Sequence, residues 1–88
     1  MSLLGFDKNA ERKLLAWSKA HPIPGYDGAV WRSDRFGMVI RFSEHGSTTE
    51  YGWEIDHRFP LALGGLDFAP NLEALHWRNN RAKGAGLI

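Results

Sequence analysis

Apolar residues recur with a helical period near the start of the chain. In residues 7–20, DKNAERKLLAWSKA, the apolar positions lie three or four residues apart: Ala10, Leu14, Leu15 and Trp17. Asp7 is a suitable N-cap, and Pro22 disfavours a helical conformation at the residue before it. The pattern therefore predicts a helix over residues 7–20 that packs one face against a core.

Two later segments alternate between apolar and polar residues with the period of two that is typical of β-strands. Their large apolar side chains each share one face: Met38, Ile40 and Phe42 in residues 38–43, and Tyr51, Trp53 and Ile55 in residues 51–57. The second segment turns Glu54 and Asp56 to the opposite face. The intervening EHGSTTE has the composition of a turn, so the two segments are predicted to form an antiparallel hairpin.

The pattern changes again after this hairpin. Pro60 and the Gly64-Gly65 pair indicate a loop over residues 58–70, followed by a short strand over residues 71–75. Residues 76–83 are predicted to form a short helix that Gly84 caps. The loop is expected to be ordered, because its large apolar side chains can pack inward: Phe59, Leu61, Leu63, Leu66 and Phe68. The resulting order of helix, hairpin, loop, strand and helix predicts an α+β fold.

Length and composition narrow the class of protein. A chain of 88 residues is predicted to be one domain, residues 1–88, with a small core. The absence of cysteine excludes disulfides and cysteine-ligated zinc. Neither a run of about 18 apolar residues nor a secretory signal pattern is present, so we expect no membrane partner and a cytoplasmic location.

The net charge of +1 does not indicate nucleic-acid binding, but the distribution of charge is uneven. Three basic residues, Arg78, Arg81 and Lys83, follow one another near the C-terminus without an intervening acid. They are candidate phosphate-binding residues on the predicted helix. The alternative is a solvated helix end whose cations suit the helix dipole.

Asp56 and His57 are the first candidates for chemistry. Neighbours in a regular strand point to opposite faces, so both serve one site only if the strand ends there, as Pro60 indicates. A carboxylate can hold a cation, and a histidine, which titrates near neutrality, can accept a proton from water. Asn80 on the following helix offers a neutral oxygen ligand suited to Mg²⁺, although the adjacent Asn79 is an alternative ligand.

Three further polar residues each have a structural and a functional interpretation. Asn71 is a turn or cap residue, or it bonds main-chain groups across the loop and thereby orients His57. Glu54 is the polar side of a strand, which we favour, or it reaches a metal through water. His76 is favoured as a helix cap or packed residue over a metal ligand.

Residues 54–83, EIDHRFPLALGGLDFAPNLEALHWRNNRAK, resemble the motif of HNH nucleases, the ββα-metal finger. Asp56-His57 stands at the first position, Asn71 follows His57 by fourteen residues, and Asn80 follows by nine more. Lys83, Pro60 and the paired glycines also stand at matching intervals, and the flanking sequence is similar to a small bacterial and phage subgroup. The motif core spans residues 51–84, and the quoted segment covers roughly a third of the chain.

The resemblance implies a role for each matching residue. Asp56 and Asn80 would hold one divalent metal, and His57 would be the general base that Asn71 orients. Lys83 would be a phosphate contact, and Arg81 and Arg78, singled out above by the distribution of charge, are expected to hold neighbouring phosphates. Mg²⁺ is the expected metal, with Mn²⁺ or Ni²⁺ as substitutes. Structural zinc is not expected, because this chain has His76 and Asn79 where a second cysteine pair often stands.

The function that the resemblance implies is metal-dependent hydrolysis of phosphodiester bonds in DNA, most readily double-stranded DNA. So small a surface suggests that a protein partner supplies specificity. Two alternatives stay open. The domain is a catalytically silent module that binds nucleic acid, or it is an interaction module within a phage or bacterial assembly.

Overall fold

A computed structural model describes residues 7–88 of the chain. The first helix, α1 (Lys8–Ser18), begins as predicted, because the Asp7 carboxylate accepts a hydrogen bond from the main-chain N–H of Ala10 at 2.6 Å. The helix ends two residues before the predicted boundary. Leu14 and Leu15 are exposed, contrary to the predicted stripe. The face that meets the core is instead made of Ala16, Trp17 and, just past the helix, Ala20. Alanines there allow the helix to approach the sheet closely.

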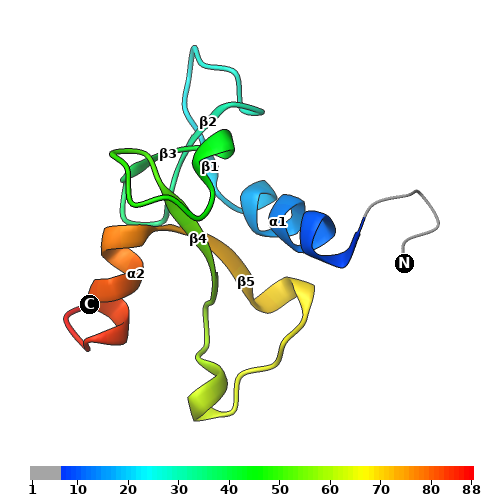
Figure 1. The fold of residues 1–88 in the computed structure, drawn as a ribbon, viewed down its shortest axis with the longest axis vertical. Coiled ribbons are helices and arrows are strands. Elements are labelled where there is room, and N and C mark those ends of the chain that lie inside the picture. Colours follow the sequence, from blue (N-terminus) through cyan, green and yellow to red (C-terminus); the bar gives the residue numbers. More distant parts are fainter. Residues whose placement is uncertain (1–6) are drawn as a thin grey trace.

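Five short strands form two antiparallel sheets (Figure 1). The first sheet has the order β1-β2-β3 and contains β1 (His21–Pro22), β2 (Trp31–Ser33) and β3 (Val39–Arg41). The second sheet pairs β4 (Trp53–His57) with β5 (Leu72–His76), and α2 (Trp77–Gly84) follows β5 directly. Short 3-10 turns connect these elements: Phe42–Glu44, Leu61–Leu63 and Ala69–Asn71. The α+β class is therefore confirmed.

The predicted hairpin of residues 38–43 with 51–57 is wrong. β3 pairs with β2, and β4 pairs with β5, so residues 58–71 connect the two strands of the second hairpin. One main-chain hydrogen bond, from Arg41 N to Tyr51 O at 3.0 Å, joins the two segments that were expected to pair. The alternating pattern identified strands and their faces, but it carries no information about which strands are partners.

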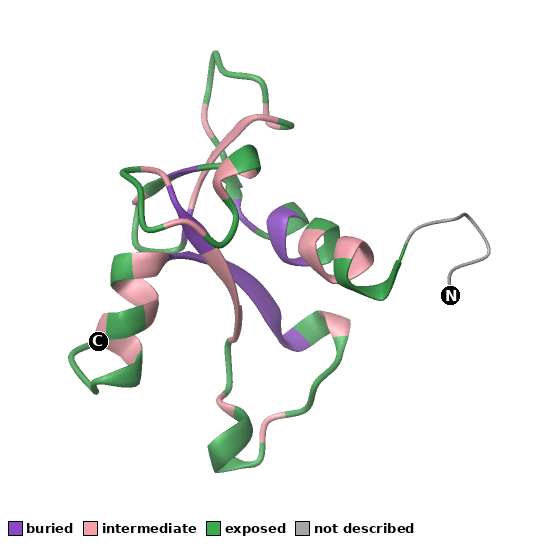
Figure 2. Ribbon diagram, viewed as in Figure 1, coloured by how far each residue is buried: buried purple, intermediate pink, exposed green. Residues whose placement is uncertain are grey.

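The β4–β5 pair lies between the two helices (Figure 1). Trp53 is fully buried beneath α1, with its ring 5.2 Å from that of Trp17 and 6.1 Å from that of Phe42. Every residue of β5 is buried, as the purple strand in Figure 2 shows. The core that surrounds these rings consists of small and branched side chains: Ala16, Ala20, Ile40, Leu72 and Ala74. Glu54 and Asp56 face α2 on the other side, as the alternation predicts.

The loop of residues 58–70 does not pack as predicted. Its large apolar side chains are all about half exposed or more: Phe59, Leu61, Leu63, Leu66 and Phe68. The loop extends away from the two sheets, as Figures 1 and 2 show, so there is no core surface for these side chains to cover. Order in the loop depends on polar contacts instead.

Both ends of α2 are set by specific groups. His76 is the N-cap, because its Nδ1 accepts from Arg78 N at 3.1 Å, and its Nε2 contacts the Glu50 carbonyl at 2.7 Å. His76 is therefore a helix cap, the interpretation that the sequence favoured over a metal ligand. Gly84 lies within the helix, so its predicted role as the cap is wrong. Gly86 follows with a φ of 75°, the left-handed conformation that glycine adopts at low cost. None of the helices in residues 7–88 is long and apolar enough to cross a membrane.

Asp34 joins the first sheet to the second and to α2. Its carboxylate is fully buried at the turn between β2 and β3. Oδ1 accepts from the main-chain N–H of Phe36 at 3.0 Å and of Met38 at 2.9 Å. Oδ2 accepts from His76 N at 3.0 Å and from Asn79 Nδ2 at 2.9 Å. One side chain thus closes the turn and fixes the point at which β5 becomes α2.

We expect Asp34→Asn to destabilise the fold by at least about 2 kcal/mol, because one acceptor oxygen becomes an amide NH2 group, a donor that faces buried donors. Chemical denaturation monitored by tryptophan fluorescence measures this change. Asp27→Asn is the matched control, since exposed Asp27 accepts one turn hydrogen bond that asparagine can also accept. Equal stability of the two variants would contradict the role assigned to Asp34.

Candidate active site

A shallow cavity lies between the end of β4, the start of the loop and α2. Its volume is about 370 Å³. The lining includes four of the residues that the sequence singled out, with the loop and the helix end supplying the remainder: Asp56, His57, Pro60, Leu61, Ala62, Asn80, Lys83 and Gly84. The structure therefore brings the proposed metal ligands, the proposed base and Lys83 to one place.

Local geometry explains why these side chains converge. β4 turns alternate residues toward α2, and Asn80 and Lys83 stand one turn apart on the face of α2 that meets them. The Lys83 ammonium forms an ion pair with the Asp56 carboxylate. It also donates to the main-chain oxygens of His57 at 2.6 Å and Arg58 at 3.2 Å. Lys83 was predicted as a phosphate contact, and here it binds the end of β4 instead.

The orientation of Asn80 is set by Glu54. The Asn80 amide nitrogen donates to Glu54 Oε1 at 3.2 Å, so the amide oxygen is left to face other partners. The neighbouring Asn79 donates its amide to Asp34 and is committed to the fold. Of the two asparagines considered as ligands, Asn80 is the one that lines the cavity. Glu54 is more than the polar side of a strand, because it positions a residue of the site.

His57 is held by an acid that the sequence did not single out. Its Nε2 lies 2.8 Å from Asp67 Oδ1, and the same oxygen pairs with Arg12 of α1 at 2.7 Å. The hydrogen bond from His57 and, to a smaller extent, the hydrogen bond from Arg12 lower the pKa of Asp67 below its usual value. An ionised carboxylate only accepts, so Nε2 carries the proton and Nδ1 is the nitrogen that can accept another. Asp67 stands in a loop without periodicity, so no signal in the sequence identifies it.

Asn71 holds the two sides of the loop together. The side chain is buried. Its Oδ1 accepts from Phe59 N at 2.8 Å, and its Nδ2 donates to Phe59 O at 2.9 Å and Leu66 O at 2.8 Å. These are the cross-loop hydrogen bonds that the sequence interpretation expected. They fix the chain two residues after His57 and one residue before Asp67.

Arg78 and Arg81 lie outside the cavity. Both guanidiniums stack on the Trp77 ring, at 5.0 and 4.9 Å from its centroid. The two arginines are exposed. They form a separate cationic surface along α2, next to the cavity that Asn80 and Lys83 line.

The side chains of the cavity suit a hard cation better than a soft one. Residues 7–88 contain no group of three or more His, Cys, Asp or Glu side chains arranged to hold a metal. The donors at the cavity are the Asp56 carboxylate and the Asn80 carboxamide, and Mg²⁺ takes oxygen ligands while it retains several waters. The donor set therefore fits Mg²⁺, on the condition that the Lys83 ammonium moves off Asp56.

Asn71→Ala is expected to destabilise the protein by about 1–3 kcal/mol, because main-chain groups of Phe59 and Leu66 lose their partners. The Phe59 amide hydrogen should exchange faster with solvent, and NMR-detected exchange measures this. Asn9→Ala, on the exposed face of α1, is the control and should leave both values unchanged. Unaltered protection of the Phe59 amide in Asn71→Ala would show that the loop is held by something else.

Comparison of the chain with protein-family models, with curated proteins and with solved structures gave no match. The function is therefore inferred from the side chains that line the cavity and from the resemblance of residues 54–83 to the HNH motif. The main structural observation is that Asp56, His57 and Asn80 line one cavity.

Proposed function

We propose that the chain is a metal-dependent HNH endonuclease and that β4, β5 and α2 form its ββα-metal core. One observation carries the proposal: Asp56, His57 and Asn80, separated by up to 24 positions in the sequence, line a single cavity. Asn71 supports the proposal. The motif has an asparagine at this position that is expected to form hydrogen bonds across the loop, and the Asn71 side chain forms such bonds with the main chain of Phe59. The substrate class is DNA, with the double-stranded form preferred.

Asp56 and Asn80 would hold one divalent metal, with Mg²⁺ expected and Mn²⁺ or Ni²⁺ as substitutes. When bound, the metal supplies stabilisation for the negative charge that develops on the phosphate and on the departing 3′ oxygen. The Lys83 ammonium, which pairs with Asp56 in the structure, would be released. Once free, it becomes available for a phosphate oxygen, which is the role expected from the motif.

His57 acts as the general base. Nδ1 accepts a proton from water while the water oxygen bonds to phosphorus, and the bond from phosphorus to the 3′ oxygen breaks. The 3′ oxygen then takes a proton from solvent. Asp67 keeps the proton of the free imidazole on Nε2, and Asn71 fixes the main chain that follows His57. These two contacts position the base before substrate binds.

Arg78 and Arg81 extend the positive charge of the site along α2. Both are exposed, and stacking on Trp77 restricts their motion. They would contact phosphates beside the scissile one, and such contacts position a duplex without reading its sequence. A partner protein would then supply sequence specificity.

We expect the wild-type protein to nick supercoiled plasmid when Mg²⁺, Mn²⁺ or Ni²⁺ is present. His57→Ala should lower the rate by about 10²–10⁴-fold, the usual contribution of a general base. His45→Gln is the control, because His45 lies outside the cavity, and it should cleave at the wild-type rate. Absence of nicking with every metal, or equal rates for wild type and His57→Ala, would rule out the nuclease.

Metal binding gives a separate prediction. Isothermal titration with Mn²⁺ should show one site per chain in wild type and in His57→Ala. Asp56→Ala should lose this binding, and Asn80→Ala should weaken it, because each variant removes an oxygen donor. Unchanged Mn²⁺ affinity in Asp56→Ala would show that the ion binds elsewhere.

The contact between Lys83 and Asp56 favours a second candidate function. A lysine that neutralises Asp56 is also what a catalytically silent nucleic-acid-binding module would contain. DNA binding that survives both EDTA and His57→Ala, without nicking, would support this module and contradict the nuclease.

A further inference from the structure

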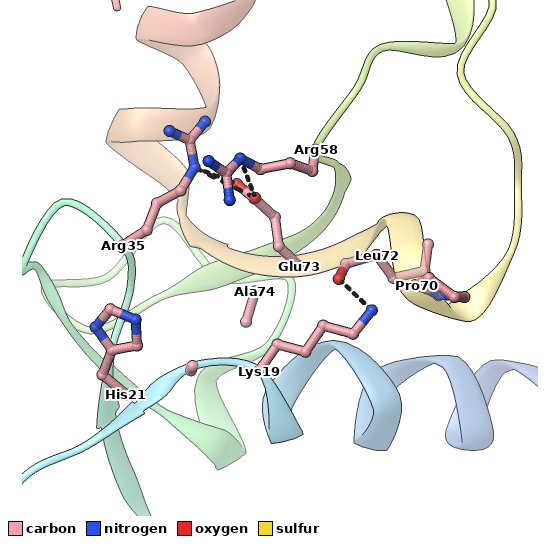
Figure 3. Close-up of a pocket in the computed structure, with 9 residues that line it drawn as sticks. Lys19, His21, Arg35, Arg58, Pro70, Leu72, Glu73 and Ala74 are labelled. Carbon is pink, nitrogen blue, oxygen red and sulfur yellow. Dashed lines mark hydrogen bonds and ion pairs between the residues drawn. The ribbon is translucent and has the colours of Figure 1, made fainter.

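A second, smaller cavity lies beside the proposed active site. Its volume is about 130 Å³. Its lining includes four charged side chains, Lys19, Arg35, Arg58 and Glu73, together with the imidazole of His21 (Figure 3). Pockets for organic ligands usually measure about 300–1,000 Å³. The cavity is therefore sized for a single ionic group.

The lining of this cavity carries more positive than negative charge. Lys19, Arg35 and Arg58 are cationic, and Glu73 is the one acid among the lining residues. The Lys19 ammonium donates to two main-chain oxygens, those of Leu72, at 2.9 Å, and Ala69, so two of its three N–H donors are used. Burial lowers the pKa of Lys19, while the Glu73 carboxylate opposes this effect. Most of the donors for a ligand therefore come from the two arginines.

Glu73 aligns the two guanidiniums. It is a buried carboxylate of β5, and both of its oxygens accept from Arg35 Nε, at 3.0 and 3.3 Å. Arg58 Nε lies 3.8 Å from the same group. Figure 3 shows the guanidiniums side by side above Glu73. Both contacts use the Nε atoms of the arginines. The terminal Nη groups of Arg35 and Arg58 donate no hydrogen bond to residues 7–88. Arg35 is fixed further by stacking on Phe36 at 4.3 Å.

The arginine pair is linked directly to the proposed active site. Arg58 follows His57 in the chain, and its main-chain oxygen accepts from Lys83 at 3.2 Å. Glu73 is the register partner of Asp56 across the β4–β5 pair. Paired residues in antiparallel strands have Cα atoms about 4.5–5.5 Å apart. A group bound by the arginines therefore lies next to a group bound at Asp56.

We propose that Arg35 and Arg58, aligned by Glu73, bind a backbone phosphate of a nucleic acid, adjacent to the phosphate at the active site. Planar guanidiniums with unused Nη donors match the geometry of phosphate oxygens. The excess positive charge favours an anion, and the small volume favours one phosphate over a base. This inference rests on the nucleic-acid substrate of the proposed function, but it requires no catalysis.

Fluorescence anisotropy with a labelled duplex oligonucleotide in EDTA tests the proposal without metal or cleavage. Arg58→Gln should weaken binding about 5–10-fold at 0.1 M salt and reduce the slope of log affinity against log salt by about 0.9, the value for one phosphate contact. Arg35→Gln should act in the same direction. Arg41→Gln, the same charge change at an exposed arginine of β3, should alter neither value beyond a small uniform effect.

A duplex with methylphosphonate linkages at single positions supplies the matching test on the ligand. One position should weaken binding of wild type but not of Arg58→Gln, because the contact is already missing there. Arg58 is largely exposed, so its variant is expected to fold even if Arg35→Gln does not.

Affinity and salt slope of Arg58→Gln equal to those of Arg41→Gln would overturn the proposal, as would lack of saturable DNA binding by wild type. Binding of a glutamate-rich peptide with the same dependence on Arg58 would assign the cavity to an acidic protein and also overturn it. Plasmid cleavage is a separate readout. A chain that binds DNA through Arg58 but never nicks would refute only the nuclease.

Discussion

The arrangement of this small protein depends on the buried carboxylate of Asp34. Four hydrogen bonds converge on it, two from its own turn, one from the main chain at the end of β5 and one from the Asn79 side chain of α2. The contact fixes where α2 begins, and therefore where Asn80 and Lys83 stand on its first and second turns. With so few strands and so small a core, a satisfied buried acid specifies an arrangement that apolar packing alone would leave loose.

A second polar contact controls the opposite side of the site. Asn71 bonds across the loop to Phe59 and Leu66, in a segment whose apolar side chains are exposed. Asp34 thus sets the helix side of the cavity, and Asn71 sets the side of His57. Lys83 neutralises Asp56 within the cavity, and next to it two arginines pair with the single carboxylate of Glu73. This arrangement places cationic side chains both within the cavity and beside it.

Much of the fold could be predicted from residue patterns, and the limits have physical causes. Asp7 identified the start of α1. The alternation in β4 correctly predicted that Asp56 lies on the face opposite Trp53, and this face meets α2. The same alternation could not identify β5 as the partner of β4, because pairing depends on contacts distant in sequence. Asp56, His57, Asn71 and Asn80 could be singled out by their spacing. Asp34 and Asp67 could not, since an isolated acid in a turn or loop has the same local pattern whether or not it is buried or bound to a histidine.

We propose that Asp56 and Asn80 form a metal site with His57 beside it. The most direct measurement is an anomalous difference map from crystals grown with Mn²⁺. One peak is expected, bonded to oxygens of both side chains, with the Lys83 ammonium displaced from Asp56. Full occupancy of Mn²⁺ at any other position, or an intact Lys83–Asp56 ion pair at saturating Mn²⁺, would contradict it.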